Sequence, residues 1–229
     1  MGKKGVILWD IDGTLLFNTN ESRMSVHSAA LELIGVNCRK NEHKLTGLTD
    51  YEAITQLIKS NIIEVHNETL MDVFIELDKC YFQNYDDENL SLHPGVTVDL
   101  MNKLGRDWEL GIITGNTTFR AFLKLNACGL LKHLNPNLIF TSKFGDTRID
   151  ITQRAKKAID RDINLRNNKK FVVGDTLYDI EAGIKAGFKV ISIATGDYSY
   201  SELNSRNPDM VIRNLQIDIK KFYEVLSRS

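Results

Sequence analysis

From Pro94 onward the chain alternates short apolar runs with amphipathic stretches, and this alternation limits the folds open to it. The apolar runs have the length of strands and lie at 110–114, 138–140, 171–174, 190–194 and 210–212. Helical patterns fill the intervals, near 96–104, 118–127, 149–163, 177–186 and 217–226, and Gly105, Gly129 and Gly187 stand where helices end. Uninterrupted apolar strands alternating with helices are typical of a parallel sheet covered on both faces. The sequence therefore predicts an α/β, Rossmann-like doubly wound parallel sheet.

Residues 18 to 91 break this alternation. They contain three helical patterns, near 21–34, 50–60 and 68–85, and no convincing strand. In the third pattern, apolar or aromatic residues recur on one helix face, at Leu70, Phe74, Leu77 and Tyr81. We expect a core (catalytic) α/β domain formed by residues 1–17 plus 92–229, with residues 18–91 inserted as an α-helical cap domain.

An apolar strand at the start of the chain ends abruptly in two carboxylates, Asp10 and Asp12, followed by Gly13 and Thr14. A buried carboxylate is costly unless it is paired, hydrogen-bonded or bound to a metal. On a regular strand, residues two apart point to the same face, with Cα atoms roughly 6–7 Å apart. The alternative interpretation is an Asp-Gly hairpin turn with solvated acids.

Polar residues also follow two later strands, as Thr114-Gly115-Asn116 and as Asp175 with Asp179 beyond it. In an open parallel sheet the carboxyl ends of the strands share one edge, where ligands bind. Four aspartates meeting there need a cation, because two like charges 4 Å apart repel by about 4 kcal/mol at an effective dielectric of 20. With oxygen ligands alone, Mg²⁺ is the expected ion.

Three segments resemble motifs of the haloacid dehalogenase superfamily of phosphohydrolases. They are Asp10-Ile11-Asp12-Gly13-Thr14, Ile113-Thr114-Gly115-Asn116, and Gly174-Asp175-Thr176-Leu177-Tyr178-Asp179. The helical insert is similar to the cap of the phosphoglycolate phosphatase and β-phosphoglucomutase branch, and Thr46-Gly47-Leu48-Thr49-Asp50 resembles the loop that such caps place on the substrate. The family's third motif, usually a lysine followed by proline, is altered here. Arg148 is the best candidate for its basic residue, and Lys143 and Arg154 compete with it.

The resemblance implies a role for each matching residue. Asp10 would be the nucleophile, forming an aspartyl-phosphate, and Asp12 the general acid and base. Thr114 and Arg148 would stabilise the phosphoryl group as charge develops on it. Substrate or phosphate binding would fall to Gly13, Thr14, Gly115, Asn116 and Gly47. The metal ligands would be Asp10, Asp12 through its backbone carbonyl, Asp175, and Asp179 either directly or through water.

The function that this resemblance implies is a Mg²⁺-dependent phosphatase acting on a small phosphorylated metabolite. Asp12 favours phosphoryl transfer over dehalogenation, because attack on carbon leaves no alkoxide to protonate. A phosphomutase of the same fold is the nearest alternative. A phospho-acceptor signalling module is another, but such modules are about half this length and lack a cap. A glycosidase using Asp10 and Asp12 would leave Thr114, Asp175 and Asp179 without a role.

Charge and composition narrow the class of partner. A net charge of -1 gives no general reason to bind nucleic acid or an anionic membrane. The three cysteines are widely spaced and form neither a metal motif nor a disulfide framework, which favours a reducing compartment. We expect a cytoplasmic enzyme without a membrane span. Substrate identity and oligomeric state are not readable from the sequence.

Overall fold

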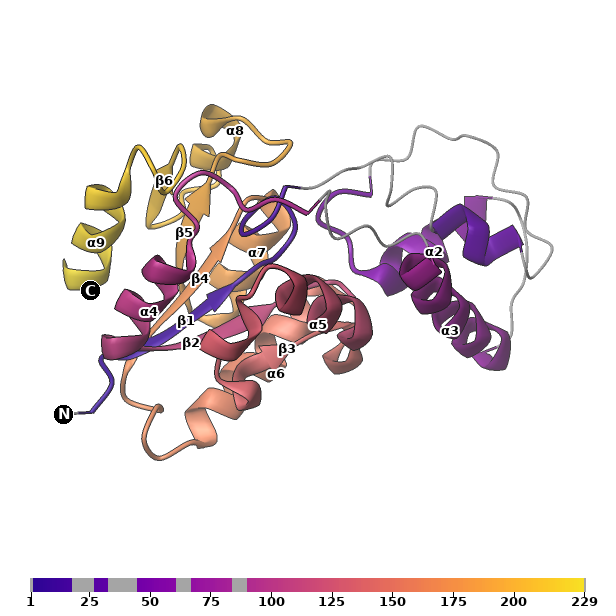
Figure 1. The fold of residues 1–229 in the computed structure, drawn as a ribbon, viewed down its shortest axis with the longest axis horizontal. Coiled ribbons are helices and arrows are strands. Elements are labelled where there is room, and N and C mark those ends of the chain that lie inside the picture. The colour runs from indigo at the N-terminus through magenta and orange to yellow at the C-terminus, as the bar shows by residue number, and fades with distance from the viewer. Residues whose placement is uncertain (1, 18–26, 33–44, 61–66, 84–89, 229) are drawn as a thin grey trace.

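The computed structural model describes residues 2–17, 27–32, 45–60, 67–83 and 90–228. Its centre is one six-stranded sheet in the order β3-β2-β1-β4-β5-β6, with every pairing parallel (Figure 1). The strands are β1 (Gly5–Trp9), β2 (Trp108–Ile113), β3 (Ile139–Phe140), β4 (Lys169–Gly174), β5 (Lys189–Ile193) and β6 (Met210–Ile212). The first strand of the chain therefore lies in the middle of the sheet, with β2 and β4 as its neighbours.

Helices cover both faces of the sheet. They are α4 (Val98–Asp107), α5 (Thr118–Ala127), α6 (Arg148–Arg161), α7 (Leu177–Ala186), α8 (Tyr200–Asn204) and α9 (Ile219–Arg228), with short 3₁₀ turns at Leu131–His133, Pro136–Leu138 and Ser142–Phe144. Along β1, Ile7 and Trp9 pack with α4, α5 and α9, whereas Val6 and Leu8 pack with α6 on the other face. Because successive strand residues point to opposite faces, both sides of β1 must be apolar. The predicted doubly wound α/β class is confirmed.

Two details differ from the sequence expectations. Gly105 lies inside α4, which continues to Asp107, and therefore does not end the helix. Gly187 does end α7, with the left-handed backbone (φ +78°) expected there. The short helix α8 was not predicted; its capping box between Ser199 and Glu202 is a signal that the sequence did contain.

The inserted segment has an apolar cluster of its own. Residues 27–32 are helical, followed by α2 (Asp50–Ser60) and α3 (Asn67–Gln83). The cluster is drawn from this segment alone and includes Leu31, Ile54 and Leu77. Leu70, Phe74 and Tyr81 pack against it, as the helical period of α3 predicts. The other residues of the helix expected at 21–34 lie outside the described part.

The two ends of the insert lie close together. The Phe17 amide donates to the Ser91 carbonyl at 3.0 Å, and Leu16 forms an antiparallel bridge with Leu92. This pairing fits the expected boundaries near 18 and 91, which remain a prediction. In the described ranges, no helix combines the length and the apolar character that crossing a bilayer requires.

Candidate active site

The carboxyl edge of the sheet gathers most of the predicted site residues around one small cavity of about 20 Å³. Loops after β1, β2 and β4, the first residue of α6 and the loop before α2 form its wall: Asp10, Asp12, Thr46, Gly47, Leu48, Thr114, Gly115, Asn116, Arg148 and Thr176. This volume holds about one water molecule. Four predicted residues, Gly13, Thr14, Asp175 and Asp179, do not line the cavity and lie beside it.

Three carboxylates meet at one edge of this cavity. Asp10, Asp175 and Asp179 are buried and offer oxygen atoms within 4.8 Å of one another. Burial raises the pKa of Asp10 to about 7, although the Arg148 guanidinium acts in the opposite direction. Burial, together with the charges of Asp10 and Asp179, also raises the pKa of Asp175 well above its usual range. The cluster is therefore poorly stabilised as a set of three bare carboxylates.

A divalent cation fits this cluster. Arg148 Nη2 lies 2.7 Å from Asp10 Oδ1 and 2.8 Å from Asp179 Oδ1, so one positive charge faces three carboxylates and two negative charges remain. Asp179 Oδ1 is buried and receives no well-directed hydrogen bond from the described residues. An all-oxygen, doubly negative set suits a hard cation such as Mg²⁺.

Gly13 and Thr14 support Asp175. The Thr14 hydroxyl donates to Asp175 Oδ1 at 2.8 Å. Gly13 has a left-handed backbone (φ +84°), and a Cβ there would lie 2.2 Å from Asp175 Oδ2. Gly196, which was not predicted, is restricted by the same carboxylate, since a Cβ there would lie 1.8 Å from the same oxygen. The Asp175 carboxylate is thus packed between two glycines.

Asp12 has surroundings unlike those of Asp10. Its two carboxylate oxygens accept hydrogen bonds from Lys124 Nζ at 2.6 and 2.8 Å, and Oδ2 also accepts one from Asn116 Nδ2 at 2.7 Å. Burial disfavours the ionised form, but the Lys124 ammonium and these hydrogen bonds together lower the pKa of Asp12. Asp12 is therefore held as a carboxylate outside the three-aspartate cluster.

Lys124 was missed by the sequence reasoning. It lies in α5 on the same side as the buried Ala121 and Leu125 and is itself only 5% exposed. A lysine on the apolar face of an amphipathic helix needs a buried partner, and this was the signal available in the sequence.

Of the three basic candidates for the third motif, Arg148 is the one that contacts the acidic cluster. Thr147 and Asp150 form a capping box that fixes the start of α6, and Arg148 is its first residue. Besides its contacts with Asp10 and Asp179, its Nη1 donates to the Ile113 carbonyl at 3.4 Å. Lys143 lines a different cavity, and Arg154 is exposed.

The loop before α2 is seated on the core. Thr46 Oγ1 donates to Asp197 Oδ2 at 2.5 Å, and the Asp50 amide donates to the Gly115 carbonyl at 2.8 Å. Gly47 has a left-handed backbone (φ +82°) and packs so tightly on the Tyr178 ring that a Cβ would lie 2.4 Å from it. Through this loop, the insert forms the part of the cavity wall that faces the core residues.

A buried ion pair holds the base of α2 to α5. Asp50 accepts from Arg120 Nη1 at 2.8 Å and from the Thr117 amide at 2.9 Å, and its Oδ1 lies 3.2 Å from His27 Nε2. Asp50, Arg120 and His27 are all buried. Arg120 and His27 were not among the predicted site residues.

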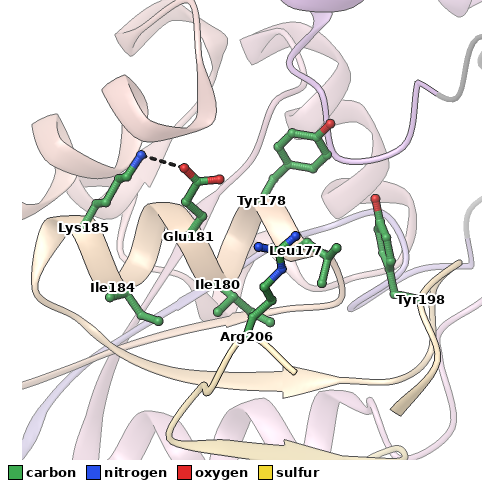
Figure 2. Close-up of a pocket in the computed structure, with 8 residues that line it drawn as sticks. All are labelled: Leu177, Tyr178, Ile180, Glu181, Ile184, Lys185, Tyr198 and Arg206. Atoms are coloured by element: carbon green, nitrogen blue, oxygen red, sulfur yellow. Dashed lines mark hydrogen bonds and ion pairs between the residues drawn. The ribbon is translucent and has the colours of Figure 1, made fainter. Parts of the chain in front are cut away.

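A larger cavity, of about 470 Å³, lies along the outer side of α7. Figure 2 shows Tyr178 and Tyr198 projecting to the same side of it, with Arg206 beside Leu177 and Lys185 paired to Glu181. None of the predicted site residues lines this cavity. The smaller cavity, which is lined by Asp10, Asp12 and Arg148, is the better candidate for chemistry.

Comparison with known proteins agrees with the fold. A family model described as haloacid dehalogenase-like hydrolase matches residues 7–193. A phosphoglycolate phosphatase from Aquifex aeolicus (strain VF5) is 24% identical over 213 residues, covering 90% of this chain and 91% of the relative. Among solved structures, a hydrolase from Pseudomonas syringae superposes with a TM-score of 0.72 at 18% identity, covering 96% of this chain and 99% of the other. A predicted phosphoglycolate phosphatase from Haemophilus somnus 129PT gives 0.71 at 21%, covering 96% and 98%.

Proposed function

The chain belongs to the haloacid dehalogenase-like hydrolase family, and from this premise we propose that it is a Mg²⁺-dependent phosphatase of a small phosphorylated metabolite. The observation that carries the proposal is the pairing of Asp10 with Arg148 at 2.7 Å, beside the Asp175 and Asp179 carboxylates. A carboxylate oxygen and a guanidinium thus lie together at a cluster of three carboxylates. This arrangement suits transfer of a phosphoryl group, whose charge must be neutralised while it moves.

In the first step, an Asp10 carboxylate oxygen attacks phosphorus and the bond from phosphorus to the leaving oxygen breaks. That oxygen takes the electron pair of the broken bond and a proton from Asp12, which at this point carries the proton that it accepted from water in the previous turnover. The product alcohol leaves, and Asp10 carries the phosphoryl group as an acyl phosphate. Arg148 and the Thr114 side chain stabilise the phosphoryl oxygens during this step.

In the second step, Asp12 is a carboxylate and accepts a proton from water as the water oxygen attacks phosphorus. The bond from phosphorus to the Asp10 oxygen breaks, which restores the Asp10 carboxylate and releases inorganic phosphate. The ionised form of Asp12 is the one that accepts the hydrogen bonds from Lys124 and Asn116. Asp12 thus gives up a proton as acid in the first step and regains one as base in the second, so it ends the cycle in its starting form.

Asp10, Asp175, Asp179 and the backbone carbonyl of Asp12 would hold Mg²⁺. When bound, the ion supplies positive charge that screens the carboxylates from the incoming phosphate and orients one of its oxygens. The protein's own contribution is to keep Asp175 fixed between Gly13 and Gly196 and to keep Arg148 against Asp10.

The substrate is a metabolite small enough to sit between the core and the Thr46–Asp50 loop. A cavity of about 20 Å³ is too small for any phosphate ester, so this loop must lift for entry and product release. The name of the Aquifex relative makes 2-phosphoglycolate the first compound to try.

A panel of metabolite phosphates, with p-nitrophenyl phosphate as a general probe, tests the proposal by release of inorganic phosphate with and without Mg²⁺. We expect Mg²⁺-dependent release that Asp10→Asn abolishes, and an unchanged rate in Lys103→Met, an exposed lysine on α4. Comparable release by Asp10→Asn would refute the assigned nucleophile. Formation of an isomeric phosphate ester with little free phosphate, dependent on a bisphosphate activator, would point to a phosphomutase instead.

A further inference from the structure

Lys124 is a buried cation that forms an ion pair with Asp12. Its Nζ donates to both carboxylate oxygens of Asp12, at 2.6 and 2.8 Å, and to Asn116 Oδ1 at 3.1 Å. Asn116 in turn donates to Asp12 Oδ2 and to the Thr114 hydroxyl, both from Nδ2. Asp12, Asn116 and Lys124 thus form a closed triangle in which each side chain is bonded to the other two.

We propose that Lys124 is a positioning residue for Asp12, and that Tyr81 of the helical insert completes its site. The proposal rests on the function proposed above, because it concerns the residue that serves there as acid and base. Asp10 and Asp12 are two residues apart but bind different cations, Arg148 and Lys124. Separate cations keep the Asp12 carboxylate away from the three-aspartate cluster and aimed at the cavity that both aspartates line.

Tyr81 connects this arrangement to the insert. Its ring, from α3, lies over Lys124 Nζ at 5.5 Å and over Arg120 Cζ at 4.7 Å. Nearby, Thr117 Oγ1 donates to Asp78 Oδ1 at 2.5 Å, which fastens α3 to the start of α5. A cation under an aromatic face is stabilised more strongly when water is excluded. Seating of the insert therefore places an aromatic face over the Lys124 ammonium and helps to keep it charged beside Asp12.

The kinetic test compares two esters that differ in their need for an acid. An alkyl phosphate such as 2-phosphoglycolate has a poor leaving group and depends on protonation by Asp12, whereas p-nitrophenyl phosphate depends on it little. We expect Lys124→Met to lower kcat/KM for 2-phosphoglycolate about tenfold more than for p-nitrophenyl phosphate. Asp12→Asn should shift the same ratio, and the double variant should shift it no further. Lys103→Met is the matched control.

Equal losses on the two esters, or independent and additive losses in the double variant, would overturn the proposal. The role of Tyr81 is tested in the same assay, where Tyr81→Phe keeps the ring and should keep the ratio, while Tyr81→Leu should move it in the direction of Lys124→Met. A Tyr81→Leu variant with the ratio of the wild type would remove Tyr81 from the account.

A crystal structure of Lys124→Met decides the positioning claim without reference to activity. We expect the 2.7 Å contact between Asp12 Oδ2 and Asn116 Nδ2 to be lost as the carboxylate turns away. An Asp12 carboxylate in its original place would overturn the proposal. If the wild type hydrolysed neither ester, the phosphatase assignment would fail, and this structure would still confirm or refute Lys124 as the residue that positions Asp12.

Discussion

Asp10 and Asp12 show how surroundings give neighbouring carboxylates different chemistry. Burial raises the pKa of Asp10, whereas the pKa of Asp12 is lowered, because the Lys124 ammonium and its hydrogen bonds outweigh the cost of burial there. A lowered pKa suits Asp12 to the second step, in which it is ionised and acts as base, whereas the first step requires Asp12 protonated and Asp10 ionised. A bound dication beside Asp10 favours its ionised, nucleophilic form.

Gly13 makes a residue-level prediction about the metal site. In Gly13→Ala the new Cβ would meet Asp175 Oδ2 at 2.2 Å, so the carboxylate must move. Gly129→Ala is the matched control, because Gly129 also has a left-handed backbone (φ +68°) but its Cβ would meet nothing within 4 Å. Both variants should lose about 1–2 kcal/mol of stability from backbone strain. Calorimetric titration should show Mg²⁺ affinity reduced about tenfold or more in Gly13→Ala alone. Unchanged affinity in that variant would contradict the placement of Asp175.

The motif residues could be predicted because each follows a strand, and parallel strands bring such positions to one edge. Lys124, Arg120 and Gly196 could not be found in this way. Lys124 and Arg120 lie within a helix, where the sequence shows a charged residue but not which distant carboxylate faces it. Gly196 matters only because Asp175, which follows a different strand, packs against it.

At the scale of elements, some helix boundaries could be predicted from the sequence and others could not. The predicted limits of α5 and α7 agree with the structure, and both helices begin after a threonine that accepts from the backbone three residues on. At α4 the glycine at 105 misled the prediction, because the helix continues past it to Asp107. A Cβ added at Gly105 would meet no atom closer than 3.9 Å, so nothing in its surroundings requires a glycine there.

The ion pair between α2 and α5 makes a prediction at this scale. Asp50→Asn removes the charge that compensates Arg120, which is 2% exposed, and leaves a buried cation without a full partner. We expect the free energy of unfolding to fall by about 3 kcal/mol or more in urea denaturation. Asp99→Asn, which breaks an exposed pair with Lys103, should cost less than about 1 kcal/mol. Similar values for the two variants would show that the Asp50 pair is not desolvated.

At the scale of the whole molecule, the chain builds two apolar cores. The apolar clusters around the sheet have buried members at positions 6–16 and 96–226. The apolar cluster of the insert is separate from them. The hydrogen bond from the Phe17 amide to the Ser91 carbonyl brings the two ends of the insert together. A short linker can therefore replace the insert.

We therefore predict that replacing residues 18–90 by a brief Gly/Ser linker leaves a core that unfolds cooperatively and binds Mg²⁺. Its hydrolysis of p-nitrophenyl phosphate should be slower, because the cavity is open to water, and its discrimination among metabolite phosphates should be largely lost. Circular dichroism during thermal unfolding and the phosphate-release panel provide the measurements. A product without a cooperative transition would contradict the two-core description.

The account depends above all on a phosphoryl group residing on Asp10. Acid quenching during steady-state turnover, followed by digestion and mass spectrometry, measures this directly. We predict that the peptide containing Asp10 carries one phosphoryl group in the wild type, and that the corresponding peptide of Asp10→Asn carries none. Rapid phosphate release by the wild type with the phosphoryl group on another residue would contradict the account.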